Sequence, residues 1–280
     1  MSNSNAHIQY LQVNSEGWHS EDAEVVVETP VSLTINGEVW LSLMCTPTDL
    51  EALAVGFIYN EGLIQSLDEV ASVRVCPGGE NIDIWVNHSL EKPASWRRTS
   101  GCTGGVTSQD ARVVGGEVVT YNGVTLSTSQ AGELIGLLLD SQDLYRKSGG
   151  VHTSALSDGH SLLVVTEDIG RHNTLDKIAG RCLLENIQPA RRILLTTGRV
   201  SSEMMQKAAR IGAAVVISRT SPSSLSIQMA ERWGITLIGY ARRNSMRIYT
   251  HPERMTALSS EAEKLVEDQN VKSKSETKTS

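Results

Sequence analysis

The chain of 280 residues is 40% hydrophobic and has a formal net charge of −7, from 25 Lys and Arg against 32 Asp and Glu. This composition is typical of a globular α/β protein, and the acidic balance argues against a general nucleic-acid binder, because counterion release needs a positive surface. No apolar run approaches the length of a membrane span, and the first residues do not resemble a secretory signal. We therefore expect a cytoplasmic protein that binds neither nucleic acid nor membrane.

The four cysteines are far apart in the sequence, and no two of them have the CxxC spacing of a zinc or dithiol site. In the cytosol their thiols should be reduced. The sequence therefore predicts no structural metal.

The first hundred residues predict a mixed α+β domain. Strands are expected from 25 to 44, with Asn36-Gly37 supplying the positive-φ positions of a hairpin turn. Two more strands are expected around 70–75 and 82–86, on either side of a Pro-Gly-Gly turn.

A helix is expected between these pairs of strands. Thr48 and Glu51 have the spacing of a capping box, and Gly62 should end the helix. Its apolar residues fall on one stripe that should face the core: Leu50, Leu53, Ala54, Phe57 and Ile58.

The hydrophobic pattern is lost in the middle of the chain. Residues 99–110 are aperiodic and rich in Gly, Ser and Thr, which predicts an exposed and mobile loop. A strand-like stretch follows at 113–121, and a helix is expected from Ser129 to about Lys147.

The second half alternates strands and helices, which predicts an α/β domain with a mostly parallel sheet. The expected strands are 152–156, 162–166, 193–196, 214–218 and 235–239, and the expected helices are 174–184, 202–211 and 223–233. We place an N-terminal domain at 1–120, a C-terminal domain at 121–257 and a disordered tail at 258–280.

Four loops after strands of this sheet each carry arginine: 167–173, 197–201, 219–223 and 240–245. Ligands of open parallel sheets bind beyond the carboxyl ends of the strands, where helix N-termini and guanidinium groups suit phosphate oxygens. The pattern predicts a phosphate-bearing ligand, with a set of merely solvated arginines as the alternative. Neither GxxxxGK[ST] nor GxGxxG occurs, so nothing favours a P-loop or dinucleotide enzyme.

Cys102 is the strongest candidate for a reactive thiol. It lies among glycines in the segment SGCTGG, and Arg97 and Arg98 just upstream would favour the thiolate. The alternative is a linker that happens to contain a cysteine. Of the other thiols, Cys45 and Cys182 are expected in the core and Cys76 half exposed.

Several ordered blocks of the sequence match the pattern of one known family. They are CTPTDLE with AVGFIYNEGLI, SGCTGG, GGVHTSAL, EDIGRHNTLDKIAG, TTGRVSSEMMQKAARIGA and GYARRNSMRIYTHPERM. Together they strongly resemble the FdhD family, the sulfurtransferase accessory proteins of formate dehydrogenase, over about residues 25–256. The block EDIGRHNTLDK is the most specific.

The resemblance implies a sulfur relay. Family members take sulfur as a persulfide from a cysteine desulfurase. They pass it to the molybdenum or tungsten bis-molybdopterin guanine dinucleotide cofactor before that cofactor enters formate dehydrogenase. In this sequence the persulfide would form on Cys102.

The resemblance also implies a fold, an assembly and binding residues. The family's C-terminal domain is similar to cytidine deaminases, a three-layer α/β/α arrangement, and works as a homodimer. The guanine nucleotide ends of the cofactor would lie near the last strand, with further contacts from matching blocks. The implied residues are Tyr240, Ala241, Arg242, Arg243, Asn244, Ser245, His152, Arg171 and His172.

One position departs from the family pattern. Many relatives carry a CxxC pair in the mobile loop, whereas Gly105 stands at the second cysteine position here. A relay through a local second cysteine is then not available, although a persulfide needs only one sulfur nucleophile.

Two other functions are weighed against this expectation. A zinc-dependent deaminase would suit the implied fold, but the chain lacks the P-C-x-x-C pair of that chemistry. A chaperone that carries the cofactor through the arginine loops, without chemistry, is the second alternative.

Overall fold

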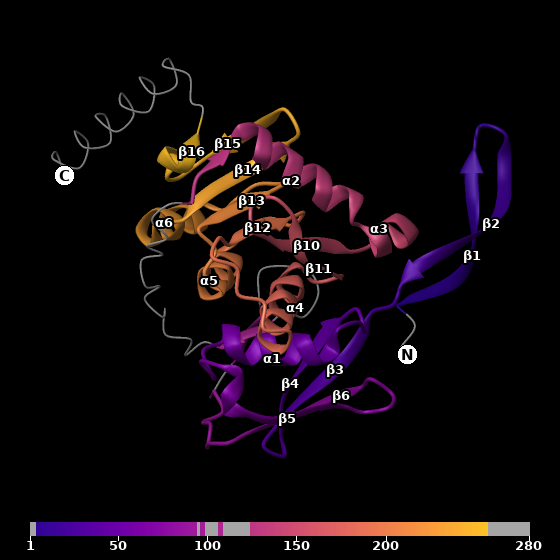
Figure 1. Cartoon of the computed structure of the whole chain (residues 1–280). Coiled ribbons are helices and arrows are strands. Elements are labelled where there is room, and N and C mark those ends of the chain that lie inside the picture. Colours follow the sequence, from indigo (N-terminus) through magenta and orange to yellow (C-terminus); the bar gives the residue numbers. More distant parts are fainter. Residues whose placement is uncertain (1–3, 94–95, 99–105, 109–123, 257–280) are drawn as a thin grey trace.

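The computed structural model of the chain describes residues 4–93, 96–98, 106–108 and 124–256. It shows an α/β protein with two hydrophobic cores, one in each half of the chain (Figure 1). The predicted division at residue 120 and the predicted tail at 258–280 lie outside the described residues and stay predictions.

The N-terminal core lies between a four-stranded sheet and helix α1 (Leu50–Asn60). Strands β3 and β6 pair in parallel at the centre, and β4 and β5 flank them antiparallel. Asn36 and Gly37 have φ angles of 49° and 82°, which confirms the predicted hairpin turn. The strands are β3 (Thr29–Ile35), β4 (Glu38–Cys45), β5 (Val70–Val75) and β6 (Asn81–Val86), with the short helix η1 (Leu67–Glu69) before β5.

A six-stranded sheet forms the centre of the C-terminal half, in the order β11-β10-β12-β13-β14-β15. Its strands are β10 (His152–Ser157), β11 (Leu162–Asp168), β12 (Ile193–Thr196), β13 (Val215–Ser218), β14 (Thr236–Arg242) and β15 (Ser245–Ile248). The α/β class is confirmed, but the sheet is mixed: only β12–β13 and β13–β14 pair in parallel. The reason is that β10 and β11, and β14 and β15, are joined by short turns, which reverse the chain.

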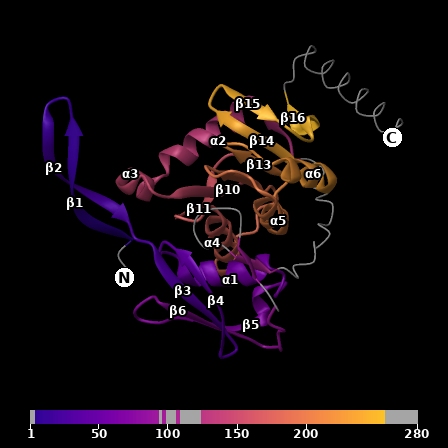
Figure 2. The same ribbon diagram turned by 180° about the vertical axis from the view of Figure 1, so that it is seen from behind.

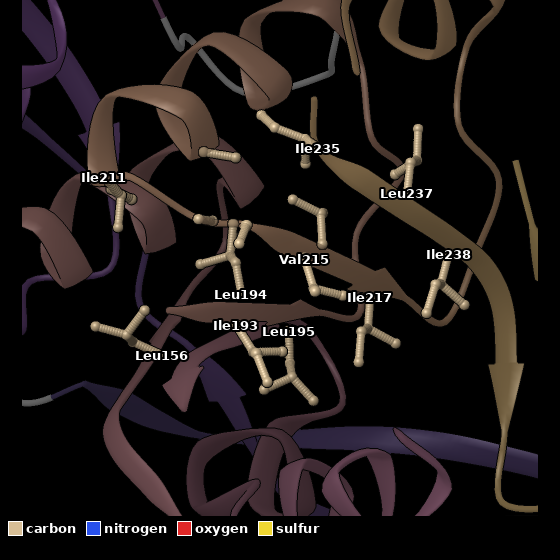
Figure 3. Packing of buried hydrophobic residues seen from close by; sticks show 14 of the residues in the cluster. Leu156, Ile193, Leu194, Leu195, Ile211, Val215, Ile217, Ile235, Leu237 and Ile238 are labelled. Carbon is tan, nitrogen blue, oxygen red and sulfur yellow. The ribbon is translucent and has the colours of Figure 1, made fainter. Parts of the chain in front are cut away.

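Helices cover this sheet on two sides (Figures 1 and 2). Helix α2 (Thr128–Asp140) lies across one face, while α4 (Arg171–Leu184), α5 (Ser202–Ile211) and α6 (Ser224–Trp233) lie side by side on the other. Figure 3 shows the Leu, Ile and Val side chains of the central strands packing between these layers. The likeness to cytidine deaminases stays a prediction.

Two predictions about helices are wrong. The helix expected from Ser129 to Lys147 is broken after Asp140, and α3 (Asp143–Ser148) follows as a separate helix. The cause is tertiary: the buried Gln142 side chain donates to Thr153 Oγ1 at 2.9 Å, and the Glu167 carboxylate accepts from the first backbone N–H groups of α3.

The predicted capping box of α1 does not form. The N-cap is Asp49, in the left-handed conformation with φ 49° and without a side-chain cap. Thr48 is used elsewhere, because its hydroxyl accepts a hydrogen bond of 3.0 Å from Lys177 Nζ.

Helices α1 and α4 join the two cores by an unusually close contact. A Cβ atom on Gly56 would lie 1.8 Å from the backbone oxygen of Asp176, and one on Gly180 would lie 1.9 Å from that of Ala52. Only glycine fits at either position, so the two backbones meet directly there.

A hairpin of β1 (Asn5–Asn14) and β2 (Gly17–Val26), which the sequence did not lead us to expect, extends away from both cores (Figures 1 and 2). Residues 106–108, within the segment predicted as a loop, form strand β8 (Val106–Ser108), which pairs with β7 (Trp96–Arg98). The strand-like stretch at 113–121 lies outside the described residues. The remaining elements are β9 (Leu126–Ser127), η2 (Pro252–Arg254) and β16 (Met255–Thr256).

None of the helices in the described residues is both long and apolar enough to span a membrane.

Candidate functional site

The four arginine-bearing loops meet at one edge of the six-stranded sheet. Strands β11 to β14 run in the same direction, because β10 is antiparallel to both β11 and β12. Ser218 Oγ donates to Gly198 O at 2.8 Å, and Val200 and Pro222 form a bridge, so loops 197–201 and 219–223 are joined twice. We call this edge, formed by residues 167–173, 197–201, 219–223 and 240–245, the arginine rim.

Arg219 and Arg242 lie next to one another on the rim. Arg219 Nη1 donates to Ala241 O at 3.0 Å, and Arg242 Nη1 donates to Arg219 O at 2.7 Å. These two hydrogen bonds to backbone oxygens join loops 219–223 and 240–245. Burial, and then the charge of Arg242, lower the pKa of Arg219. Among the described residues no carboxylate forms an ion pair with either side chain, which leaves their charge available to an anionic ligand.

Tyr240 has a strained backbone on this edge. Its φ of 51° is left-handed, and the register of β14 against β15 shifts between Gly239 and Arg242. Tyr240 N donates to Thr220 O at 3.0 Å, and the Arg247 guanidinium lies 4.2 Å from the ring centroid. The residue is 39% exposed, and strained backbone of this kind is often found at functional sites.

The other residues predicted from 240–245 are placed differently. Ala241 is fully buried, so only its backbone reaches the rim. Arg243 lies against α2, where its Nη2 is 3.1 Å from the position of a Cβ on Gly136. Asn244 is exposed in the turn, and Ser245 is exposed at the start of β15. The structure therefore brings Tyr240 and Arg242 to the rim and separates Arg243 from them.

His152 and His172 lie beside one another at the β10 and α4 end of the rim. His152 Nδ1 is 3.5 Å from Thr197 Oγ1, and His172 Nε2 is 3.3 Å from Ser201 Oγ. Burial, and then the charge of Arg171, lower both pKa values, that of His172 to about 2. Both imidazoles are therefore neutral near pH 7, and each can donate or accept a hydrogen bond.

A buried ion pair holds the loop that carries Arg171 and His172. Asp168 and Lys177 are both fully buried, with 2.7 Å between Oδ2 and Nζ. The Asp168 carboxylate also accepts from Thr46 N, Gly170 N and Asn173 Nδ2 at 2.8 to 3.1 Å.

Lys177 completes the link to the N-terminal half. Its ammonium donates to Thr46 O at 3.1 Å, as well as to Thr48 Oγ1 and Glu167 O. The network joins the turn between β4 and α1 to the rim loop, and it was not predicted from the sequence. The one hint in the sequence is that Asp168 and Lys177 both lie in the segment EDIGRHNTLDK, because Asp and Lys are rarely buried unless they are paired.

Where the structure describes the thiols, Cys45 and Cys76 lie as the sequence predicts, whereas Cys182, which was predicted in the core, is only partly buried beside it. Cys45 is fully buried, and burial, then the Asp168 carboxylate, raise its pKa to about 12. Burial raises the pKa of Cys182 to about 11, and Cys76 is half exposed with its sulfur accepting from Asn81 N. Cys102 lies outside the described residues.

Within the described residues no group of three or more His, Cys, Asp or Glu side chains is placed to hold a metal ion. The donors that gather at the rim are arginines, hydroxyls and neutral imidazoles, and such groups suit an anion.

The fold and the rim define an α/β protein whose central sheet ends in an arginine-lined edge. The model of the FdhD/NarQ family matches residues 26–256, and the chain belongs to this family. A sulfur carrier protein FdhD of Bacillus licheniformis is 35% identical over 249 residues, which cover 86% of this chain and 93% of the relative. One of Staphylococcus aureus is 34% identical over 239 residues, covering 83% and 89%.

A solved structure has a similar fold. The crystal structure of a chain described as a formate dehydrogenase accessory protein, from Desulfotalea psychrophila, superimposes with a TM-score of 0.76 at 31% identity. The match covers 90% of this chain and all of the other.

Proposed function

We propose that the chain is a sulfur carrier for formate dehydrogenase. Cys102 accepts sulfur as a persulfide from a cysteine desulfurase. It passes this sulfur to the bis-molybdopterin guanine dinucleotide cofactor, the cargo, before the cofactor is inserted. Support comes from the names of the relatives and from the single observation that carries the proposal, the arginine rim at the end of the sheet.

The rim has the chemistry that a nucleotide-bearing cargo needs. Arg219 and Arg242 offer two cationic forks for phosphate oxygens. The N-termini of α4, α5 and α6 open towards the same edge, and the positive ends of their helix dipoles add partial positive charge. Tyr240 presents an exposed aromatic ring beside them, on which a purine base can stack.

The transfer proceeds through two exchanges of a sulfur atom. The Cys102 thiolate attacks the outer sulfur of the desulfurase persulfide, a new S–S bond forms, and the desulfurase cysteine leaves as a thiolate. The outer sulfur then bonds to the metal of the cargo while the S–S bond breaks. The sulfur gains two electrons, which oxidation of the metal supplies, and Cys102 leaves as a thiolate.

Calorimetry with a guanosine diphosphate probe tests the rim. Arg242→Ala should weaken binding about tenfold or more, because one charge-assisted fork is worth about 1.5–3 kcal/mol. Arg232→Ala removes an exposed arginine at the far end of α6 and should leave the affinity unchanged. Equal affinity in all three proteins would overturn the assignment of the rim.

A chaperone without sulfur chemistry would use the same rim, so the thiol must be tested separately. Cys102→Ala should bind the nucleotide as the wild type does and fail to activate formate dehydrogenase. Full activation by this variant would favour the chaperone.

A further inference from the structure

The pairing of β10 with β12 ends at a hydroxyl group. The last residue pair of the two strands is Ser154↔Thr196. Beyond it, Thr197 N donates to Thr153 O at 2.9 Å, whereas Thr153 N donates at 3.0 Å to Oγ1 of the Thr197 side chain. The Thr197 hydroxyl thus takes the place that a backbone carbonyl has in a regular antiparallel pair. This hydrogen bond fixes the hydroxyl at the point where the rim loop leaves the sheet.

The proton of the Thr197 hydroxyl has one acceptor among the described residues. Oγ1 already accepts from Thr153 N, and His152 Nδ1 lies 3.5 Å from it. The Thr153 hydroxyl is engaged elsewhere, since it donates to Glu167 and accepts from Gln142. If the imidazole donated to Oγ1 instead, the hydroxyl proton would have no acceptor in this part of the chain. The arrangement that satisfies every group therefore has Thr197 donating to Nδ1.

A neutral imidazole that accepts at Nδ1 carries its proton on Nε2. Burial, and then the charge of Arg171, lower the pKa of His152, and the charge of Arg199 acts in the same direction. The ring therefore lies within electrostatic reach of two rim arginines. Nε2 has no hydrogen-bond partner within the residues that the structure describes, so its N–H group is available to a ligand.

We propose that Thr197 is a positioning residue whose hydroxyl holds His152 as the tautomer with the proton on Nε2, so that the ring offers one uncharged donor to a phosphate oxygen at the rim. The proposal rests on the proposed function, because it takes the ligand of the rim to be a nucleotide. Arg171 and Arg199 attract an anion by charge, whereas a fixed N–H group also requires an acceptor atom in one direction.

The nitrogen resonances of the His152 ring, measured by NMR in the full chain without ligand, test the tautomer. His152→Gln identifies the signals of this ring. Wild type and Thr197→Ser, which keeps the hydroxyl, should carry the proton on Nε2. Thr197→Val has nearly the same shape without the hydroxyl and should show both tautomers. A wild-type ring with its proton on Nδ1, or a Thr197→Val ring indistinguishable from the wild type, would overturn the proposal.

Calorimetry with guanosine diphosphate tests the consequence for binding. Thr197→Val should weaken the affinity about three- to tenfold, the fold-change of one neutral hydrogen bond, and Thr197→Ser should bind as the wild type does. Thr250→Val is the matched control. Its buried hydroxyl also accepts from a backbone N–H group, that of Leu237 at 2.9 Å, and donates to Ile235 O, at the start of β14 and away from the rim. This control should cost stability and leave the affinity and the tautomer unchanged.

Two substitutions of His152 locate the donor on the ring. Counted in bonds from Cβ, the amide nitrogen of Gln corresponds to Nε2 and that of Asn to Nδ1. His152→Gln should therefore bind guanosine diphosphate more tightly than His152→Asn. The reverse order, or unchanged affinity in Thr197→Val, would overturn the role of the tautomer in binding. A wild type that does not bind guanosine diphosphate would overturn the proposed function of the rim, while the resonances of the ligand-free chain would still decide whether Thr197 sets the tautomer.

Discussion

Lys177 is the residue on which the geometry of the rim depends most. Its ammonium group is fully buried, 2.7 Å from Asp168, and reaches backbone oxygens in both halves of the chain. The pair holds the loop from which Arg171 and His172 reach the rim. Lys177 is therefore a positioning residue, since its contacts with the rim loop are with Glu167 and Asp168, at the start of that loop.

Lys177→Met should lower the free energy of unfolding by about 3–5 kcal/mol, because it leaves the Asp168 carboxylate buried without its cation. It should also weaken guanosine diphosphate binding, measured by calorimetry at a temperature where the variant is folded. Lys207→Met is the matched control. It breaks the buried pair with Asp176 and should cost similar stability while changing the affinity much less, because its ion pairs are with Asp176 and Glu61, outside the rim. Equal affinity in both variants would contradict the positioning role.

His172 makes the stability of the protein depend on pH in a predictable direction. Its folded pKa is lowered from 6.5 to about 2, first by burial and then by Arg171. Above pH 6.5 both states hold a neutral ring. Below pH 6.5 only the unfolded state takes up the proton. The free energy of unfolding therefore decreases as the pH is lowered from 6.5 to about 2.

Between pH 7 and pH 5 this group should cost about 2 kcal/mol of stability. Urea unfolding at both pH values measures the loss, and His172→Gln, which cannot titrate, should lose less by that amount. The same pH dependence in wild type and variant would contradict this, because it would mean that the pKa of His172 is the same in the folded and the unfolded protein.

At the scale of elements, the contact between α1 and α4 fixes the position of the two cores relative to one another. Gly56→Ala should destabilise the protein by about 3 kcal/mol or prevent folding, because the new methyl group meets backbone and not a movable side chain. Gly136→Ala in α2 meets only the end of the Arg243 side chain and should be neutral or stabilising by up to about 1 kcal/mol, the helix propensity of alanine. Thermal unfolding compares the two, and similar values would contradict a backbone-to-backbone contact.

The elements also show where sequence patterns suffice. Strand β12 and helix α5 have the predicted bounds, because each carries a strong local pattern and a clear end. The break between α2 and α3 could not be predicted, since it depends on Thr153 and Glu167, which are distant in sequence. The hairpin of β1 and β2 escaped prediction because exposure on both faces removes the alternation that marks a half-buried strand.

For the whole molecule, the sequence predicted that four loops share an edge, because the direction of strands in crossover units is strongly constrained. It could not predict which side chains face that edge. Arg242 and Arg243 are neighbours in sequence, yet a two-residue turn sends Arg243 towards α2. The roles of the rim residues and of Cys102 stay predictions.

The central claim is that sulfur travels on Cys102. Intact-mass spectrometry after incubation with a cysteine desulfurase and cysteine, followed by peptide mapping, tests it most directly. The wild type should gain the mass of one sulfur atom on the peptide that contains Cys102, Arg242→Ala should gain it equally, and Cys102→Ala should gain none. Undiminished sulfur on Cys102→Ala, or sulfur mapped to Cys76, would contradict the account.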